Sequence, residues 1–343
     1  MTESVIRVGS PYFEELAVGQ VFDDAPAVTL SSGHAVLHEA VFGDRLRLPL
    51  DAELSREVTG REQPLANPSL VCNVAIGQTT GPSGRVMGNL FYRGLVLRRP
   101  AFLGDTLRTT TTIAALRQNR PKPGRAATGM AVFEVHVENQ RGETVLHFWR
   151  CPMLPCRDES ANTGHADSFD AIPAELDMAQ VRAAVPANWR LDVFRERLAG
   201  QHFAEVPEGA KFRVEGRDTV TCVPEIARMT LNMARAHTDA AASPHGKRLV
   251  YGGHTIALAA SQITRALPNL VTFVAWRSCD HTAPVFEGDV LRTEFELETK
   301  HPLEGGGGLV DLRAIVYAER GAEALHPGAE DAVLDWRAIG LMA

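Results

Sequence analysis

The stretches Arg-Pro-Ala-Phe-Leu-Gly-Asp-Thr-Leu-Arg-Thr at residues 99–109 and Ala-Pro-Val-Phe-Glu-Gly-Asp-Val-Leu-Arg-Thr at residues 283–293 are two copies of one motif. Pro100 corresponds to Pro284, an offset of 284 − 100 = 184 residues. Because the chain has 343 residues, this offset of about half its length indicates two copies of a whole domain rather than a short-period solenoid. The chain is therefore predicted to be a tandem duplication, and differences between its halves carry information about function.

The repeat continues beyond this motif, since residues 129–142 align with residues 308–321. The offset there is 308 − 129 = 179, and the change falls where residues 119–125 face residues 302–308. Both of these segments are rich in turn-forming residues, so the difference in length is expected in hairpin loops, where it costs little.

Each half reads as one apolar helix followed by alternating strands. In residues 254–267 the apolar side chains recur on one helical stripe, and the counterpart in the first half covers residues 69–79, directly after Pro68. Period-two runs such as residues 107–113 and 290–297 predict strands. This order predicts an α+β fold in which a helix lies against a curved antiparallel sheet, twice over.

The domain organisation follows from the same pattern. We expect an N-terminal domain over residues 1–156, a linker with a docking helix over residues 157–200, and a C-terminal domain over residues 201–343. The polar stretch at residues 155–170 has the composition of a linker, and residues 174–200 look helical on either side of Pro186.

The composition is that of an ordinary globular protein, with 45% hydrophobic and 22% charged residues. A net charge of −7 argues against a nucleic-acid partner. The five scattered cysteines form no zinc spacing and predict free thiols in a reducing compartment. The first residues lack the pattern of a signal peptide, and no apolar run is long enough to span a membrane. We therefore expect a cytoplasmic protein without a metal or membrane anchor.

The Pro-x-Phe-x-Gly-Asp element present in both halves resembles that of the MaoC-like hotdog proteins, the R-specific enoyl-CoA hydratase group. Single-domain members of that group also carry Gly-Asp-x-Asn-Pro-x-His-x-Asp and a His-Gly that opens the central helix. The resemblance implies a tandem double hotdog that adds water reversibly to an enoyl-CoA. Asp105 and Asp289 recur in both halves, so we assign them to the turn into a strand rather than to chemistry.

The first half resembles the family in length but not in chemistry. In residues 43–51 the position of the general-base histidine holds Pro49, and the helix-opening His-Gly falls on Asn67 and Pro68. A proline nitrogen has no hydrogen to donate, so it cannot polarise a thioester. We expect this half to have lost its catalytic residues.

The second half keeps the family's histidine as His237, while the aspartate five residues earlier has become Asn232. Its helix opens with Tyr251, Gly252, Gly253 and His254. The resemblance implies that His237 and Asn232 hold the water, and that Gly252 or Gly253 N–H binds the thioester oxygen at the positive end of the helix dipole.

The missing carboxylate has two candidate sources, Asp239 two residues after the histidine and Asp44 across the interface between the halves. The sequence does not choose between them. Ser261, eight residues after Gly253, resembles a serine that the family places beside the catalytic pair.

The whole chain resembles the double-hotdog mesaconyl-CoA (2-methylfumaryl-CoA) hydratases, above all in residues 249–256, 266–270, 278–282 and 74–78. The resemblance implies an acyl-CoA substrate, no cofactor, and substrate contacts from Tyr251 and His254. Because mesaconyl-CoA carries a free carboxylate, we expect a cation in the pocket, with Arg248, Arg277 and His281 as candidates. Whether double hotdogs pair further into homodimers stays open.

Three other functions compete with this interpretation. A hotdog thioesterase would use the same helix N-terminus but release free CoA, and the His-x-Asp pair at residues 237–239 speaks against it. A non-catalytic acyl-CoA binding protein would need no base, and Asn232 keeps this alternative open. An R-specific hydratase of fatty acyl-CoA would differ in its dependence on chain length.

Overall fold

The computed structural model describes Ile6 and residues 8–320 and 330–343. Met1 to Val5 and Arg7, which belong to the N-terminal segment considered above, and Gly321 at the end of the second repeat block lie outside the described residues. In the described ranges no helix combines the length and the apolar character needed to cross a bilayer.

The first half contains the predicted apolar helix and four long strands, preceded by short helices and two short strands. Its elements are η1 (Phe13–Glu15), β1 (Val21–Phe22), β2 (Val28–Thr29), α1 (Ser32–Phe42), α2 (Arg47–Leu50), α3 (Ala52–Thr59), α4 (Pro68–Gln78), β3 (Gly88–Leu97), β4 (Thr106–Gln118), β5 (Thr128–Glu138) and β6 (Thr144–Pro155).

The second half repeats this order after two connecting helices. Its elements are α5 (Met178–Ala183), α6 (Leu191–Arg197), β7 (Lys211–Arg213), β8 (Asp218–Thr219), α7 (Val223–Met229), η2 (Arg235–His237), η3 (Ala240–Ala242), α8 (Gly252–Ala266), β9 (Leu270–His281), β10 (Val290–Pro302), β11 (Gly308–Glu319) and β12 (Glu330–Met342). The two helices α5 and α6 flank Pro186, as predicted.

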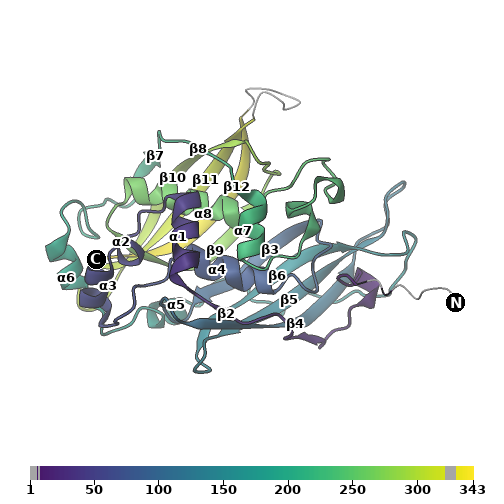
Figure 1. Cartoon of the computed structure of the whole chain (residues 1–343), viewed down its shortest axis with the longest axis horizontal. Helices are drawn as coiled ribbons and strands as arrows, with labels where there is room; N and C mark the ends of the chain where they lie inside the picture. Colours follow the sequence, from purple (N-terminus) through teal and green to yellow (C-terminus); the bar gives the residue numbers. More distant parts are fainter. Residues whose placement is uncertain (1–5, 7, 321–329) are drawn as a thin grey trace.

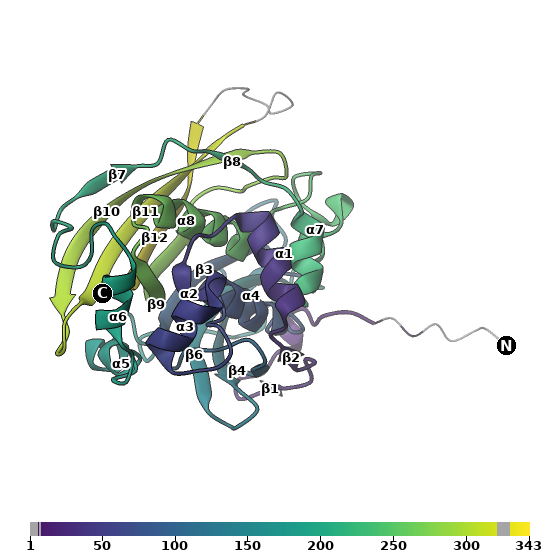
Figure 2. The ribbon, with the colours of Figure 1, turned by 60° about the vertical axis from the view of Figure 1, so that its left-hand side comes forward.

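The twelve strands of the described residues belong to one antiparallel system in the order β1-β4-β5-β6-β3-β9-β12-β11-β10-β7, with β2 on β4 and β8 on β10. The halves join where β3 pairs with β9, through Leu95 opposite Trp276 and Val96 opposite Ala275. The sheet curves, and the helices α1, α4, α7 and α8 lie together on its concave side (Figures 1 and 2). The predicted double hotdog is therefore confirmed.

The two central helices are the core of the molecule. Every residue of α4 is buried, because the helix is enclosed by the sheet of its own half and by α8. A helix enclosed in this way is apolar all round, which explains why its sequence shows little amphipathic pattern. Pro68 stands at its first turn, and Asn67 Oδ1 accepts a hydrogen bond from Ser69 N–H at 2.8 Å.

The duplicated Gly-Asp pair makes the same turn in both halves. Asp105 accepts a hydrogen bond from Phe102 N–H, and Asp289 accepts one from Phe286 N–H, each at 2.9 Å. The glycines before them, Gly104 and Gly288, have φ of +92° and +91°, a conformation that side chains with a Cβ disfavour. Both aspartates thus make the predicted turn into a strand.

The connecting segment packs against both halves. Val181, Trp189 and Phe194 are buried in one apolar cluster with Val96 and Phe102 of the first half and Ile339 of the second. Burial of these apolar side chains stabilises the arrangement of the two halves. The connecting segment therefore contacts both halves through one apolar cluster.

Candidate active site

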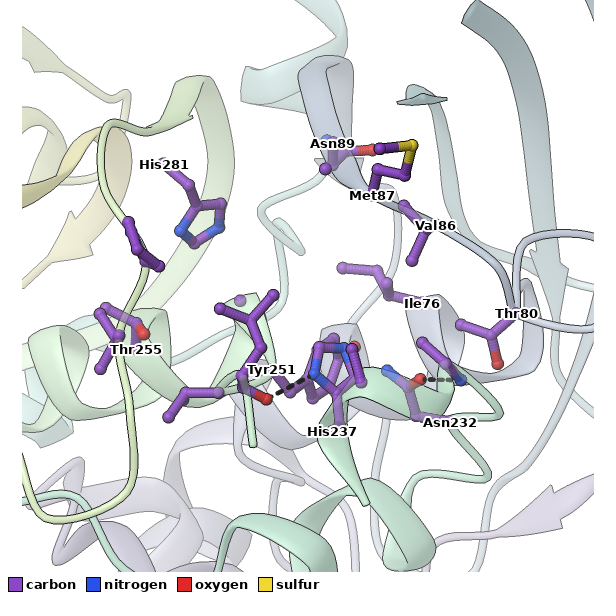
Figure 3. A pocket seen from close by; sticks show the side chains of 18 of the residues that line it. Ile76, Thr80, Val86, Met87, Asn89, Asn232, His237, Tyr251, Thr255 and His281 are labelled. Atoms are coloured by element: carbon purple, nitrogen blue, oxygen red, sulfur yellow. Dashed lines mark hydrogen bonds between the residues drawn. The ribbon is translucent and has the colours of Figure 1, made fainter. Parts of the chain in front are cut away.

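A cavity of about 310 Å³ lies between the two halves. The first half supplies the end of α4, the loop after it, the start of β3 and one side chain of β6, and the second half supplies the rest (Figure 3). Of the predicted site residues, five line it: Asn232, His237, Tyr251, Gly252 and His281. No Asp or Glu is among the described residues that line this cavity.

His237 is the candidate base. It lies in η2 with 8% of its surface exposed, and its Nδ1 is 2.7 Å from the carbonyl oxygen of Leu249. Because a carbonyl oxygen only accepts hydrogen bonds, Nδ1 carries the proton and Nε2 keeps its lone pair. Burial lowers the pKa of His237 below its ordinary value, the Leu249 carbonyl opposes that shift, and the charge of Arg150 lowers the pKa further. The ring is therefore neutral at pH 7.

Asn232 lies beside His237 at the cavity wall (Figure 3). Its Oδ1 accepts a hydrogen bond from Ala234 N–H at 2.9 Å, which leaves the Nδ2 hydrogens as donors. The preceding residue, Leu231, has φ of +57°, a strained conformation for a branched side chain. Thr80 of the first half holds this loop, because its Oγ1 accepts a hydrogen bond from Met233 N–H at 2.8 Å.

The N-terminus of α8 closes the cavity on another side. A Cβ on Gly252 would lie 2.6 Å from Nε2 of His281, and a Cβ on Gly253 would lie 1.9 Å from Oδ1 of Asn73. A side chain at either position would displace His281 or Asn73, so both positions favour glycine. Gly252 lines the cavity, whereas the open side of Gly253 faces Asn73 of α4. The first N–H groups of a helix have no partner within the helix, so this end can accept an oxyanion.

His281 and Tyr251 complete the wall around Gly252. Burial lowers the pKa of His281 to about 4, so its ring is neutral at pH 7. The Tyr251 hydroxyl donates a hydrogen bond to the carbonyl oxygen of Asn73 at 3.1 Å, and burial raises its pKa well above the ordinary value. Tyr251 thus fixes α8 against α4 and presents its ring to the cavity.

Arg150 of β6 also lines the cavity, and sequence reasoning missed it. The side chain is 3% exposed and donates hydrogen bonds to Thr79 Oγ1 at 2.7 Å and, more weakly, to Asn89 Oδ1 at 3.4 Å. One signal could have found it. Leu146, Phe148 and Arg150 alternate along a strand, so they share one face, and the arginine stands at an inward position of an apolar run.

The two predicted sources of a carboxylate lie away from the cavity. Asp239 is exposed and caps η3, where its side chain accepts a hydrogen bond from Ala241 N–H at 2.9 Å. Asp44 is buried, and its carboxylate accepts hydrogen bonds from Asn67 Nδ2 at 2.9 Å and Leu46 N–H at 3.0 Å. The structure does not bring either group to His237.

The remaining predicted residues also lie outside the cavity lining. His254 is buried against the Phe42 ring, with centroids 4.8 Å apart, and Ser261 is buried within α8. Two of the predicted cations have acidic partners, since Arg248 pairs with Glu287 and Arg277 with Asp311 at 2.9 Å. Their positive charges are thus compensated within the protein.

Comparison with known proteins agrees with this architecture. No family model matches the chain. Mesaconyl-CoA hydratase of Cereibacter sphaeroides is 28% identical over 326 residues, which cover 93% of this chain and 92% of that protein. The solved structure of RV0216 from Mycobacterium tuberculosis, described as a conserved hypothetical protein with a double hotdog fold, is 46% identical. It covers 98% of this chain and 100% of its own, with a TM-score of 0.89.

A second solved structure, a putative MaoC domain protein dehydratase from Chloroflexus aurantiacus, is 27% identical with a TM-score of 0.85 and covers 99% of both chains. The fold and the cavity between two hotdog halves define a double-hotdog protein. The chain belongs to the MaoC-like double-hotdog dehydratases. It is accordingly a hydro-lyase, an enzyme that adds or removes water.

Proposed function

We propose that the protein catalyses the reversible hydration of mesaconyl-CoA to β-methylmalyl-CoA. The observation that carries this proposal is the geometry of His237. Its Nδ1 is fixed on the Leu249 carbonyl, so its basic Nε2 serves a cavity that also contains Asn232 and the N-terminus of α8. A mesaconyl-CoA hydratase is similar to this chain over nearly its whole length.

In the proposed reaction His237 acts as both base and acid. As the water oxygen bonds to the β-carbon, Nε2 of His237 takes the proton, and the electrons of the double bond move onto the thioester oxygen. The Gly252 N–H, at the positive end of α8, stabilises the enolate that forms. The α-carbon then takes the proton back from His237, so water is added and no other acid is needed.

Asn232 would hold the water during this reaction. Its Oδ1 is engaged by Ala234 N–H, so its Nδ2 is the group that can donate to the water oxygen and orient it. An amide cannot exchange protons as an aspartate does, which agrees with a mechanism that gives both proton transfers to His237. The proposal uses no metal or cofactor, and it includes a cytoplasmic location.

Hydration of a fatty enoyl-CoA is the second candidate within the same reaction class. It shares the base, the water and the oxyanion donor, and it differs only in the acyl chain. Thioester hydrolysis and acyl-CoA binding without reaction are further alternatives, and each leaves the enoyl double bond intact.

Ultraviolet absorbance of the enoyl-thioester band tests the proposal. Purified protein is mixed with mesaconyl-CoA, with crotonyl-CoA or with a longer enoyl-CoA. Fast loss with mesaconyl-CoA alone is expected. Reaction confined to crotonyl-CoA or longer chains would shift the substrate to a fatty acyl-CoA. If all three bands stay unchanged, the hydration proposal is wrong. Thioester hydrolysis also abolishes the band, so free CoA is measured in parallel. Loss of the band with release of one CoA per substrate would indicate a thioesterase instead of a hydratase.

A further inference from the structure

Arg150 is a buried cation without an acidic partner. It lines the cavity, it is 3% exposed, and its hydrogen bonds run to the neutral oxygens of Thr79 and Asn89. Among residues 8–320 and 330–343 no carboxylate forms an ion pair with it. Burying a charge without a partner costs free energy, so an arginine in this position favours an anion that compensates its charge.

Two other poorly exposed arginines have acidic partners. The side chain of Arg320 is 10% exposed and pairs with Asp289 at 2.6 Å. The side chain of Arg265 is 25% exposed and pairs with Asp218 at 2.8 Å. Arg150 is more buried than either, yet its guanidinium meets only neutral groups among the described residues and retains unused N–H donors.

The position of Arg150 indicates which part of a substrate it meets. It shares the cavity with His237, and its charge contributes to the lowered pKa of that histidine, after the larger effect of burial. The reacting end of the acyl group must lie next to His237. An anion attached to the β-carbon would therefore lie close to the base, whereas the phosphates of CoA are separated from the reacting carbons by the whole pantetheine arm.

The repeat supplies an internal comparison. Tyr92 of β3 lies opposite Arg150 of β6, and Trp276 of β9, 276 − 92 = 184 residues later, lies opposite Ala338 of β12. The position equivalent to Arg150 in the other half thus holds an alanine. Of these two equivalent positions, the one that holds the arginine lines the same cavity as His237.

We propose that Arg150 is the receptor for a carboxylate on the acyl group, and that it selects dicarboxylic over monocarboxylic acyl-CoA. This inference rests on the proposed function for the identity of the acyl-CoA. The planar guanidinium fork matches a carboxylate with two parallel hydrogen bonds, and Thr79 and Asn89 hold the fork in place. A lysine could supply the charge but not this geometry.

Binding of two saturated thioesters tests the inference without any turnover. 2-Methylsuccinyl-CoA carries the carboxylate, and 2-methylbutanoyl-CoA has a methyl group in its place. Titration calorimetry of the full-length protein is expected to give a Kd for 2-methylsuccinyl-CoA about 100-fold lower, the value of a charged pair. In Arg150→Met this preference should fall to about onefold, and in Arg150→Lys it should be intermediate.

Arg93→Met is the matched control, because Arg93 lies on the adjacent strand β3, stacks on Phe91 and does not line the cavity. It should keep the full preference. Wild-type protein that binds both thioesters equally, or binds neither, would overturn the inference, and so would a folded Arg150→Met variant that keeps the preference. The protein could also show a carboxylate preference that depends on Arg150 and yet not hydrate mesaconyl-CoA. That result would contradict the proposed reaction but would support Arg150 as the carboxylate-binding residue.

Discussion

The two halves of this molecule contain equivalent pockets, and only one of them is open. Leu65, Ala66, Pro68 and Pro100 line a pocket of about 20 Å³, and each precedes by 184 residues a residue that lines the large cavity (249 − 65, 250 − 66, 252 − 68 and 284 − 100). The small pocket is also lined by Val185, Pro186 and Trp189 of the connecting segment. The segment that links the halves thus occupies the place where a substrate would bind.

The two pockets differ at three equivalent positions. Where the open cavity has Gly252, His281 and Arg150, the equivalent positions hold Pro68, Leu97 and Ala338. Polar and basic groups are replaced by apolar ones, which pack against the connecting segment. In the proposed mechanism the second half supplies the base and the oxyanion donor. The first half supports this site, since its Thr80 holds the loop that carries Asn232.

The largest expected effect is that of His237→Ala on hydration. Removing the base should lower kcat/KM for mesaconyl-CoA by about 1,000-fold, within the range of general acid–base catalysis. The equivalent residue of the closed half is Pro49, so Pro49→Ala should change kcat/KM less than about twofold by the same reasoning. Steady-state absorbance assays on both variants measure this. Near wild-type rates in His237→Ala would contradict the assignment of His237 as the base.

Trp189→Ala tests how the closed pocket is stabilised. Trp189 is 9% exposed in the apolar cluster of the connecting segment, so the substitution should lower the free energy of unfolding by about 3 kcal/mol. Chemical denaturation measures the loss. Hydration per folded molecule should stay unchanged, because the open cavity does not contain this residue. An unaltered unfolding free energy would show that the pocket is not filled as described.

Asn232→Ala should have a smaller effect on catalysis. Loss of the Nδ2 donor and of the bond to Ala234 would misplace the water, and kcat should fall by about 10-fold to 100-fold. Asp44 is the equivalent residue of the other half and lies outside the cavity, so Asp44→Asn is the control and should leave kcat of the folded enzyme unchanged. A larger loss in Asp44→Asn would favour a catalytic carboxylate from the first half.

The smallest expected effect is on the pH dependence. His237 must be neutral to take a proton from water, and its pKa lies below its ordinary value, so kcat/KM should be flat near pH 7 and fall only at acidic pH. Removing the Arg150 charge raises this pKa, because that charge disfavours the imidazolium. In Arg150→Met the acidic limb should therefore move to higher pH, measured with 2-methylbut-2-enoyl-CoA, which has no carboxylate. A limb that moves to lower pH would contradict the assignment.

Much of the fold could be predicted, because a repeat doubles the pattern available in one sequence. The helix predicted over residues 254–267 is α8, which covers Gly252–Ala266, and the strands predicted at residues 107–113 and 290–297 lie within β4 and β10. Strand bounds were less accurate, since β4 and β10 run on to Gln118 and Pro302. The hairpins hold longer strands than the alternating pattern alone indicates.

The site was predicted best where its residues follow one another in the chain. Asn232, His237, Tyr251 and Gly252 come from two short segments that carry the family's motif, and all line the cavity. Arg150 was not predicted, because the candidate cations Arg248 and Arg277 were chosen by proximity in sequence to the other site residues. Both have acidic partners that are distant in sequence, Glu287 and Asp311, and local sequence does not reveal such compensation.

The most direct test of the central claim is the number of acyl-CoA molecules that one chain binds. Titration calorimetry of the wild-type protein with 2-methylsuccinyl-CoA, at protein concentrations well above Kd, gives this number without turnover. We predict one molecule per chain, bound in the cavity that contains His237. Binding of two molecules per chain would show that a ligand can enter the small pocket lined by the connecting segment. It would contradict the account of one open site and one closed site.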